Sequence, residues 1–223
     1  MTKEEACRRI AALSEELEQH NYNYYILAKP TISDYEFDMK LEELARLEKE
    51  FPEYLSPASP TQRVGGGITK EFQSVKHRYP MLSLANSYSR EEIADFISRI
   101  KKTIDGDVAF CCELKFDGLS ISLQYEKGVL VRAVTRGDGT QGDDVTTNVK
   151  TIRTVPLKLH GDYPEFFEMR GEIVMPFESF DRLNEARAEA GDDLFANPRN
   201  AAAGTLKLQD SKEVACRRLD NYC

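Results

Sequence analysis

The sequence predicts an α+β protein, in which a small amino-terminal helical hairpin domain is followed by a mostly antiparallel domain. Over residues 2–27, apolar side chains recur at steps of four, three and four, the spacing of one face of an amphipathic helix. These side chains are Ala6, Ile10, Leu13 and Leu17. From residue 119 onward, apolar and polar residues alternate instead, which is the period of a strand. The change of period indicates two units of different class.

A second helix is expected to begin at Ser33, because Ser33 and Glu36 have the S-x-x-E spacing of a capping box. Pro30 should end the first helix and Pro52 the second, since proline cannot continue a helix. The apolar face of the second helix consists of Phe37, Leu41, Leu44 and Leu47. The two helices form a hairpin that is thin by itself but able to dock on a neighbouring domain.

The segment SPASPTQRVGGG, residues 56–67, combines prolines with consecutive glycines and is typical of a flexible linker. We therefore expect the helical domain at residues 1–68 and the second domain at residues 69–223. In the second domain, the alternating runs predict a hairpin of strands at residues 119–125 and 129–135. A further strand is expected at residues 166–175, and helices are expected at residues 90–102 and 177–190.

Composition excludes several classes of protein. Hydrophobic residues make up 41% of the chain and charged residues 30%, as in a globular protein, and no apolar stretch approaches the roughly 18 residues of a membrane span. The five cysteines form no CxxC pair, which indicates reduced thiols and neither a disulfide framework nor a zinc site. Residues 1–5 have no apolar segment of the kind found in a secretory signal, so the cytoplasm is expected. A net charge of -8 indicates that this chain does not hold a nucleic-acid backbone unaided.

The segment CCELKFDG, residues 111–118, is predicted to be a strand that ends in a turn. On a strand, Glu113, Lys115 and Asp117 would share one face, since side chains two residues apart point the same way. Three charges on one face can also be an ordinary solvated sheet surface, so the KxDG pattern alone is a weak signal. The functional interpretation depends on the motifs that accompany it.

A lysine amine attacks phosphorus only when it is neutral, and nearby cations lower its pKa. The sequence offers Arg136 and Arg199 as candidate cations. Arg136 opens RGDGTQGDD, residues 136–144, a glycine-rich turn whose backbone donors could lie against a phosphate or ribose. The same turn equally fits a hairpin loop with acidic side chains.

Arg170 and Glu172 interrupt the apolar run FFEMRGEIVM, where an unpaired buried charge would be costly. A ligand, a metal ion or an ion-pair partner should therefore occupy the space beside them. For Glu172, a structural ion pair with a neighbouring arginine is an equally open alternative.

In the helical hairpin, Asp34 and Asp38 lie four residues apart on one helix face, with Tyr22, Tyr24 and Tyr25 just upstream. Like charges at this spacing repel each other, and a bound cation would relieve the repulsion. The ring of oxidised nicotinamide is flat and cationic, so carboxylates and aromatic faces are a suitable receptor for it. The alternative is that the acids favour the positive end of the helix dipole and that the tyrosines pack between the helices.

Four motifs in order, ELKFDG, TRGDG, MRGE and FANPRNAAAGTLK, make the chain resemble the adenylation domain of bacterial NAD-dependent DNA ligases. The resemblance covers essentially the whole chain and implies a nucleotidyltransferase (ATP-grasp-like) fold. It implies that Lys115 attacks the α-phosphate of NAD and becomes joined to AMP, with Asp117, Arg136 and Glu172 as the other catalytic residues. The adenylate half of NAD would also contact Ser83, Leu84, Glu113 and Arg199.

The segment YYILAKPTISDYEFD, residues 24–38, is similar to the NMN-binding module of the same ligases, which the ATP-dependent ligases lack. The similarity implies that Tyr24, Asp34 and Asp38 contact the NMN half of NAD. It also assigns Tyr35, Glu36 and Phe37 to this site. Two positions depart from the family pattern, because Tyr25 stands where some members have histidine and Phe37 where many have tyrosine.

The resemblance implies an enzyme that uses NAD and Mg²⁺ or Mn²⁺. It also implies a monomer that is not associated with a membrane and that, in its full-length form, seals nicked duplex DNA in replication and repair. The later lysine-bearing motifs of the fold are missing from these residues, so we expect a carboxyl-terminally incomplete domain that is weakly active or inactive alone. The alternatives are an ATP-type nucleotidyltransferase and a non-catalytic module that binds NAD or a partner.

Overall fold

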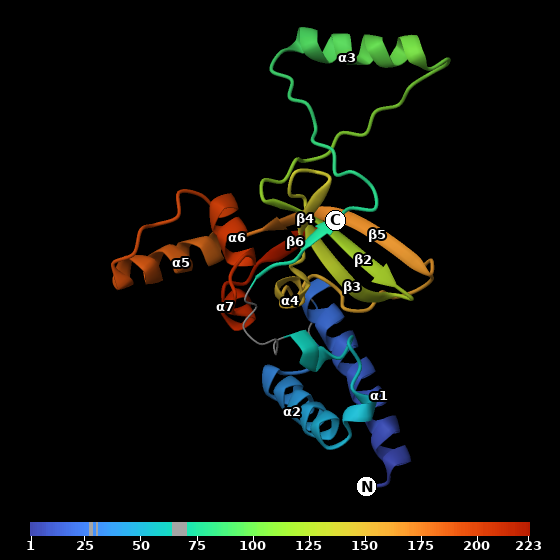
Figure 1. Cartoon of the computed structure of the whole chain (residues 1–223), viewed down its shortest axis with the longest axis vertical. Coiled ribbons are helices and arrows are strands. Elements are labelled where there is room, and N and C mark those ends of the chain that lie inside the picture. Colours follow the sequence, from blue (N-terminus) through green and yellow to red (C-terminus); the bar gives the residue numbers. More distant parts are fainter. Residues whose placement is uncertain (27–28, 30, 64–70) are drawn as a thin grey trace.

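The computed structural model describes residues 1–26, 29, 31–63 and 71–223. A helical hairpin lies at one end of the molecule, a sheet with its covering helices lies in the middle, and a single helix stands at the other end on two extended segments (Figure 1). The α+β class is therefore confirmed.

The hairpin consists of α1 (Lys3–Asn21), which continues into a π-helical turn (Tyr22–Ile26), and α2 (Asp34–Glu50). Both helices begin with a capping box, and the one expected at Ser33 is confirmed. The predicted apolar faces meet in a small core, which is formed by Ile10, Leu13, Leu17, Leu44 and Leu47. Pro30 lies outside the described residues. Pro52 opens a short 3₁₀ turn directly after α2, as expected of a residue that ends a helix.

The linker prediction is wrong for residues 56–63. Residues Pro60–Arg63 form a 3₁₀ turn, and Arg63 is only 3% exposed. Its Nη1 donates to the carbonyl oxygens of Ile152 and Val155 at 3.2 and 3.1 Å, and its Nη2 lies 3.9 Å from Oε1 of Glu18 on α1. This arginine therefore fastens the hairpin to the second domain. The glycines of the expected linker lie outside the described residues.

The main sheet has the strand order β3-β2-β5-β6 and is antiparallel throughout. Its strands are β2 (Leu119–Glu126), β3 (Val129–Thr135), β5 (Phe166–Val174) and β6 (Asp220–Tyr222). The expected hairpin and the expected third strand are thus confirmed. A smaller sheet pairs β1 (Ser74–Lys76) with β4 (Gln141–Asp143).

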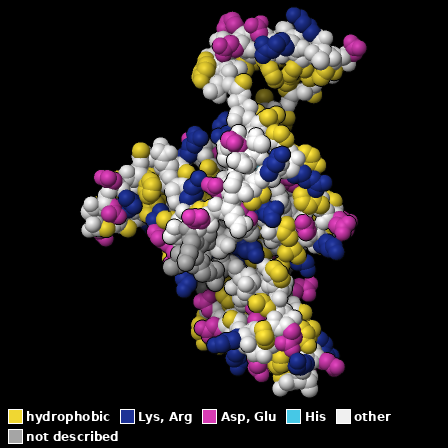
Figure 2. Space-filling view, in the orientation of Figure 1, with side chains coloured by type: hydrophobic (Ala, Val, Ile, Leu, Met, Phe, Trp, Pro, Cys, Tyr) yellow, Lys and Arg dark blue, Asp and Glu magenta, His cyan; other side chains and the backbone are white. Residues whose placement is uncertain are grey.

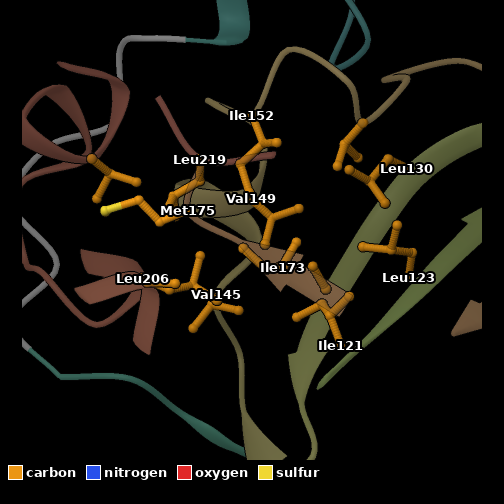
Figure 3. Close-up of a cluster of buried hydrophobic side chains, with 14 of the residues drawn as sticks. Ile121, Leu123, Leu130, Val145, Val149, Ile152, Ile173, Met175, Leu206 and Leu219 are labelled. Carbon is orange, nitrogen blue, oxygen red and sulfur yellow. The ribbon is translucent and has the colours of Figure 1, made fainter. Parts of the chain in front are cut away.

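The core lies between one face of the main sheet and the helices packed on it (Figure 3). These helices are α4 (Thr146–Val149), α6 (Pro198–Leu206) and α7 (Ser211–Cys216), and α5 (Phe177–Ala190) contacts α6 from outside. Alternation along β2 sends Ile121 and Leu123 into this core beside Ile173 of β5. The opposite face of the same two strands carries Ser120, Ser122, Glu168, Arg170 and Glu172.

The helix α3 (Arg90–Thr103) stands apart from the sheet on its two extended segments (Figure 1). Its hydrophobic side chains gather on the side that faces the rest of the molecule, and its charged side chains lie on the outer side (Figure 2). Ile93 and Phe96 remain 47% and 45% exposed, so no described residue covers this apolar face fully.

The five cysteines are free thiols at the surface. Of the helices within the described ranges, none is both long and apolar enough to cross a bilayer. Charged side chains of both signs are spread over the surface seen in Figure 2.

We expect Arg63→Ala to lower the free energy of unfolding by about 3 kcal/mol, because two buried carbonyls lose a charged donor and Glu18 loses its nearest cation. Urea denaturation followed by circular dichroism measures the change. Arg46→Ala, which removes an exposed arginine of α2, should change the value by less than about 0.5 kcal/mol. Equal effects of the two substitutions would contradict the anchoring role of Arg63.

Burial raises the pKa of the Glu18 carboxyl, although Arg63 acts in the opposite direction. The folded protein therefore holds this proton more tightly than the unfolded chain, so Glu18 contributes stability below its unfolded pKa that is lost as the pH rises through its folded pKa. The stability of Glu18→Gln relative to the wild type should thus increase as the pH rises from the ordinary glutamate pKa of about 4.3 through the raised pKa of the folded protein. Urea midpoints across this range test the expectation, with exposed Glu15→Gln as the control. A constant difference at all pH values would refute it.

Candidate functional site

The segment that carries the lysine motif is not the strand that the sequence predicts. Residues 107–117 lie outside every described strand and are almost all exposed, Lys115 included. A strand persists only where a neighbour pairs with its backbone, and no described strand pairs with this segment. No described sheet therefore holds Glu113, Lys115 and Asp117 on one common face.

The segment is held at its end, where it enters β2. Gly118 lies so close to β5 that a Cβ atom there would be 2.1 Å from the carbonyl oxygen of Ile173. Such a distance is possible only for glycine, which explains the glycine of the KFDG motif in physical terms. The backbone N–H of Gly118 donates to Oε1 of Glu172 at 3.2 Å.

Glu172 lies directly opposite Ser120 in the register of β2 and β5. Its Oε2 accepts a hydrogen bond from the Ser120 hydroxyl at 2.8 Å, so both carboxylate oxygens are used by β2 and its entrance. The structural ion pair considered for Glu172 is not formed with any described residue. Arg170 donates instead to the carbonyls of Tyr79 and Pro80 at 2.7 and 2.8 Å. Nη2 of Arg170 also lies 3.4 Å from Oε1 of Glu168. An ion pair and hydrogen bonds within the protein thus compensate both charges of the RGE motif.

A second contact orients the lysine segment. The ring of Phe116 stacks on the ring of Tyr222 in β6, with centroids 4.2 Å apart and planes 8° from parallel. Strand β6 approaches β5 closely at Gly171, where a Cβ would lie 2.3 Å from the Tyr222 carbonyl oxygen. The sequence analysis missed Tyr222, and the only available signal was an aromatic residue with no periodic neighbours.

Lys115 itself has no hydrogen-bond or ion-pair partner among the residues that the structure describes, and it is exposed to solvent. Next to it, Asp117 lies 3.3 Å from Nη1 of Arg199. Arg199 occupies the first turn of α6, which Asn197 caps through its side-chain oxygen at 2.8 Å from the backbone nitrogen of Asn200. Both members of the Asp117 pair are well exposed, so the contact contributes less than about 1 kcal/mol and mainly records their proximity.

Arg136 and Ser83 are also brought together, since Nη1 of Arg136 donates to the Ser83 hydroxyl at 3.2 Å. The neighbouring Leu84 is 78% exposed. In the turn after Arg136, Asp138 accepts from the backbone nitrogens of Gln141 and Thr140, which hold the pKa of its carboxyl below the ordinary value. These two backbone N–H groups therefore already donate hydrogen bonds within the turn. The Arg136 side chain is the group of this turn that we consider for binding a phosphate.

The predicted hairpin residues are divided among three environments. Tyr24, Phe37 and Asp38 line a cavity of about 600 Å³ between the hairpin and the second domain. Tyr35 is 74% exposed and does not line it, and the Glu36 carboxylate accepts from Ser33 as part of the helix cap. The side chains of Tyr25 and Asp34 lie outside the described part of the structure. Lys115 is not among the residues that line this cavity.

Within the described ranges, no group of three or more histidine, cysteine, aspartate or glutamate side chains is placed to hold one metal ion. Glu113 is exposed near the Cys111 thiol, and Glu172 already accepts two hydrogen bonds.

We expect Glu172→Ala to lower the free energy of unfolding by about 1–3 kcal/mol, because the Gly118 N–H and the Ser120 hydroxyl lose their acceptor. The matched control is Glu178→Ala, which removes a carboxylate that is 83% exposed on α5. Chemical denaturation of the two variants measures the difference. If both substitutions cost the same, Glu172 does not hold the entrance of β2.

Comparison with protein families matches residues 69–223 to the NAD-dependent DNA ligase adenylation domain. Residues 3–65 match a DNA ligase-like, N-terminal NAD⁺-binding domain. The two matches together account for nearly the whole chain.

Individual relatives agree with this. A DNA ligase of Christiangramia forsetii is 59% identical over 213 residues, which are 96% of this chain and 32% of that protein. DNA ligases of Bacteroides fragilis and Flavobacterium psychrophilum are each 60% identical over 215 residues, again 96% of this chain and 32% of theirs. The chain therefore spans about a third of the length of the curated relatives that it matches.

Proposed function

Because the chain belongs to the family of NAD-dependent DNA ligases, we propose that it performs the first step of ligation, in which Lys115 takes AMP from NAD and NMN leaves. The observation that supports this most is the placement of Lys115. It is exposed and without a described partner, while Phe116 and Gly118, which follow it in the chain, are held by Tyr222 and Glu172. The nucleophile is thus free to reach a substrate from a backbone that is anchored on its carboxyl-terminal side.

In the proposed step, the lone pair of Lys115 Nζ attacks the α-phosphorus of NAD. The N–P bond forms, the P–O bond to NMN breaks with its electron pair going to the NMN phosphate, and Nζ loses a proton. The amine must be neutral to react, whereas a free lysine has a pKa of about 10.4. Arg136 and Arg199 are the candidate cations that the sequence motifs supply, and both would also offset charge on the phosphoryl oxygens.

The remaining contacts of the adenylate half are assigned as follows. Ser83 and Leu84 contact adenosine, Asp117 contacts the ribose, and Glu113 contributes to the nucleotide pocket. Glu172 faces the ribose or phosphate in addition to holding Gly118. The hydrogen bond between Arg136 and Ser83 supports a common site for adenosine and phosphate groups.

The hairpin is proposed to bind the NMN half through Tyr24, Asp34, Phe37 and Asp38, with Tyr35 and Glu36 beside them on the same turn. Phe37 can stack on the ring but cannot donate a hydrogen bond. Mg²⁺ or Mn²⁺ would be held mainly through the phosphates of NAD, since the described side chains form no cage for it.

In the complete protein, the AMP would pass to the 5′-phosphate of a nick in duplex DNA, and the adjacent 3′-hydroxyl would displace it and seal the strand in replication and repair. The net charge of -8 supports a DNA grip that lies in other parts of the protein. We also propose that the protein is a monomer in the cytoplasm. Its free thiols are consistent with that compartment.

Lys115→Ala in a chain of the relatives' full length should abolish the gain of one AMP on incubation with NAD and Mg²⁺, measured by intact-protein mass spectrometry. Lys212→Ala, which removes an exposed lysine of α7, should gain AMP like the wild type. The 223-residue chain should gain it far more slowly, because its Lys115 lies in an exposed segment and makes no described contact with Arg136 or Arg199.

Three results would contradict the proposal in different ways. Labelling of the Lys115→Ala protein would exclude this nucleophile. Labelling from ATP with release of pyrophosphate, in place of NMN release from NAD, would identify an ATP-type nucleotidyltransferase. If NAD and NMN leave the melting temperature unchanged and no AMP is gained, the chain is a non-catalytic interaction module.

A further inference from the structure

The segment that follows β1 lies against the turn that begins at Arg136. The backbone N–H of His77 donates to the Thr140 carbonyl oxygen at 2.9 Å, directly beyond the pairing of β1 with β4. Further along, the Met81 N–H donates to the Gly139 carbonyl oxygen at 2.8 Å. A Cβ at Gly139, whose φ is +90°, would lie 2.8 Å from the Met81 carbonyl oxygen, so the two backbones touch. One short stretch of chain therefore holds the turn at two points.

The side chain of His77 adds a third bond to this contact. The residue is only 6% exposed, and its Nε2 lies 3.0 Å from the carbonyl oxygen of Arg136. Because a carbonyl oxygen only accepts, Nε2 carries the proton and donates. The other ring nitrogen, Nδ1, is buried and has no hydrogen-bond partner among the residues that the structure describes. Within that part of the chain, the bond to Arg136 is thus the only hydrogen bond that the ring makes.

Arg136 is held on several sides as it leaves β3. Its backbone N–H donates to the Ser120 carbonyl oxygen at 3.2 Å, and its carbonyl oxygen also accepts from the Gly139 N–H at 3.0 Å. Its side chain reaches the Ser83 hydroxyl, 3.2 Å from Nη1. The carbonyl that His77 holds is bonded to the Cα from which this side chain departs, so a tilt of the peptide displaces the guanidinium. A misplacement of about 1 Å can slow a reaction about 100-fold.

We propose that His77 is a positioning residue of the adenylation reaction and that it acts through Arg136. The inference rests on the proposed function, in which the Arg136 guanidinium offsets charge on the phosphoryl oxygens of NAD. The Nε2–H of His77 holds the Arg136 carbonyl, and this bond determines where the guanidinium lies when the phosphate reacts. The bond of Met81 to Gly139 holds the neighbouring Ser83 segment separately. Loss of the His77 donor should therefore affect the reacting phosphate more than the binding of adenosine.

Two substitutions separate the ring of His77 from its donor. His77→Phe keeps a ring in the buried space but has no donor, whereas the side-chain amide of His77→Gln can still donate. In an AMP-free chain of the relatives' full length, His77→Phe should lower the single-turnover rate of AMP gain at saturating NAD about tenfold. The half-saturating NAD concentration should change less than about twofold, because the lost contact acts in the transition state. Rapid quenching and intact-protein mass spectrometry measure both quantities.

The conservative variant and a matched control complete this series. His77→Gln should retain at least about a third of the wild-type rate, because its donor can still reach the Arg136 carbonyl. His160→Phe makes the same change at an exposed histidine outside the turn and should react like the wild type.

Removal of Arg136 distinguishes positioning from a general effect on the fold. Because His77 acts through Arg136, His77→Phe should slow the Arg136→Ala protein by less than about twofold, although it slows the wild type about tenfold. Hydrogen exchange followed by mass spectrometry should also show faster exchange of the amides of residues 137–141 in His77→Phe than in His77→Gln.

Four results would each overturn the inference alone. They are equal rates of His77→Phe and the wild type, a His77→Gln protein no faster than His77→Phe, a loss of about tenfold that persists in Arg136→Ala, and equal hydrogen exchange of the turn in the two His77 variants. Failure of the proposed function is a different result: the wild type gains no AMP from NAD, or Lys115→Ala gains it. The positioning role in adenylation then falls together with the proposed function.

Discussion

Ser120 and Glu172 lie opposite each other in the antiparallel pair of β2 and β5, and this register decides which residues reach the lysine segment. A shift by one residue would turn Glu172 into the core and Ile173 to the polar face, since neighbouring side chains point to opposite sides. The register thus determines both which side chains enter the core and where the carboxylate that accepts from the Gly118 N–H lies. The close approach of Gly118 to Ile173 then leaves no freedom for where the segment enters the sheet.

Most of the fold could be predicted because its signals are local. The stripes of α1 and α2, the capping box at Ser33 and the alternation along β2 all depend on neighbours within a few residues. The prediction of a flexible linker was wrong because the hydrogen-bond acceptors of Arg63 lie 89 and 92 residues further along the chain. No local pattern reports such a partner, and a proline-rich segment is compatible both with a mobile linker and with an anchored turn.

The same limit applies to the candidate site. Glycine-rich and charged motifs pointed to Asp117, Arg136 and Arg199, and the structure places Asp117 beside Arg199 and Arg136 beside Ser83. The strand expected over residues 111–118 failed because strand formation requires a partner, which a residue's own sequence does not supply. Tyr222 was missed for a related reason, since its stacking on Phe116 joins residues that are far apart in the sequence.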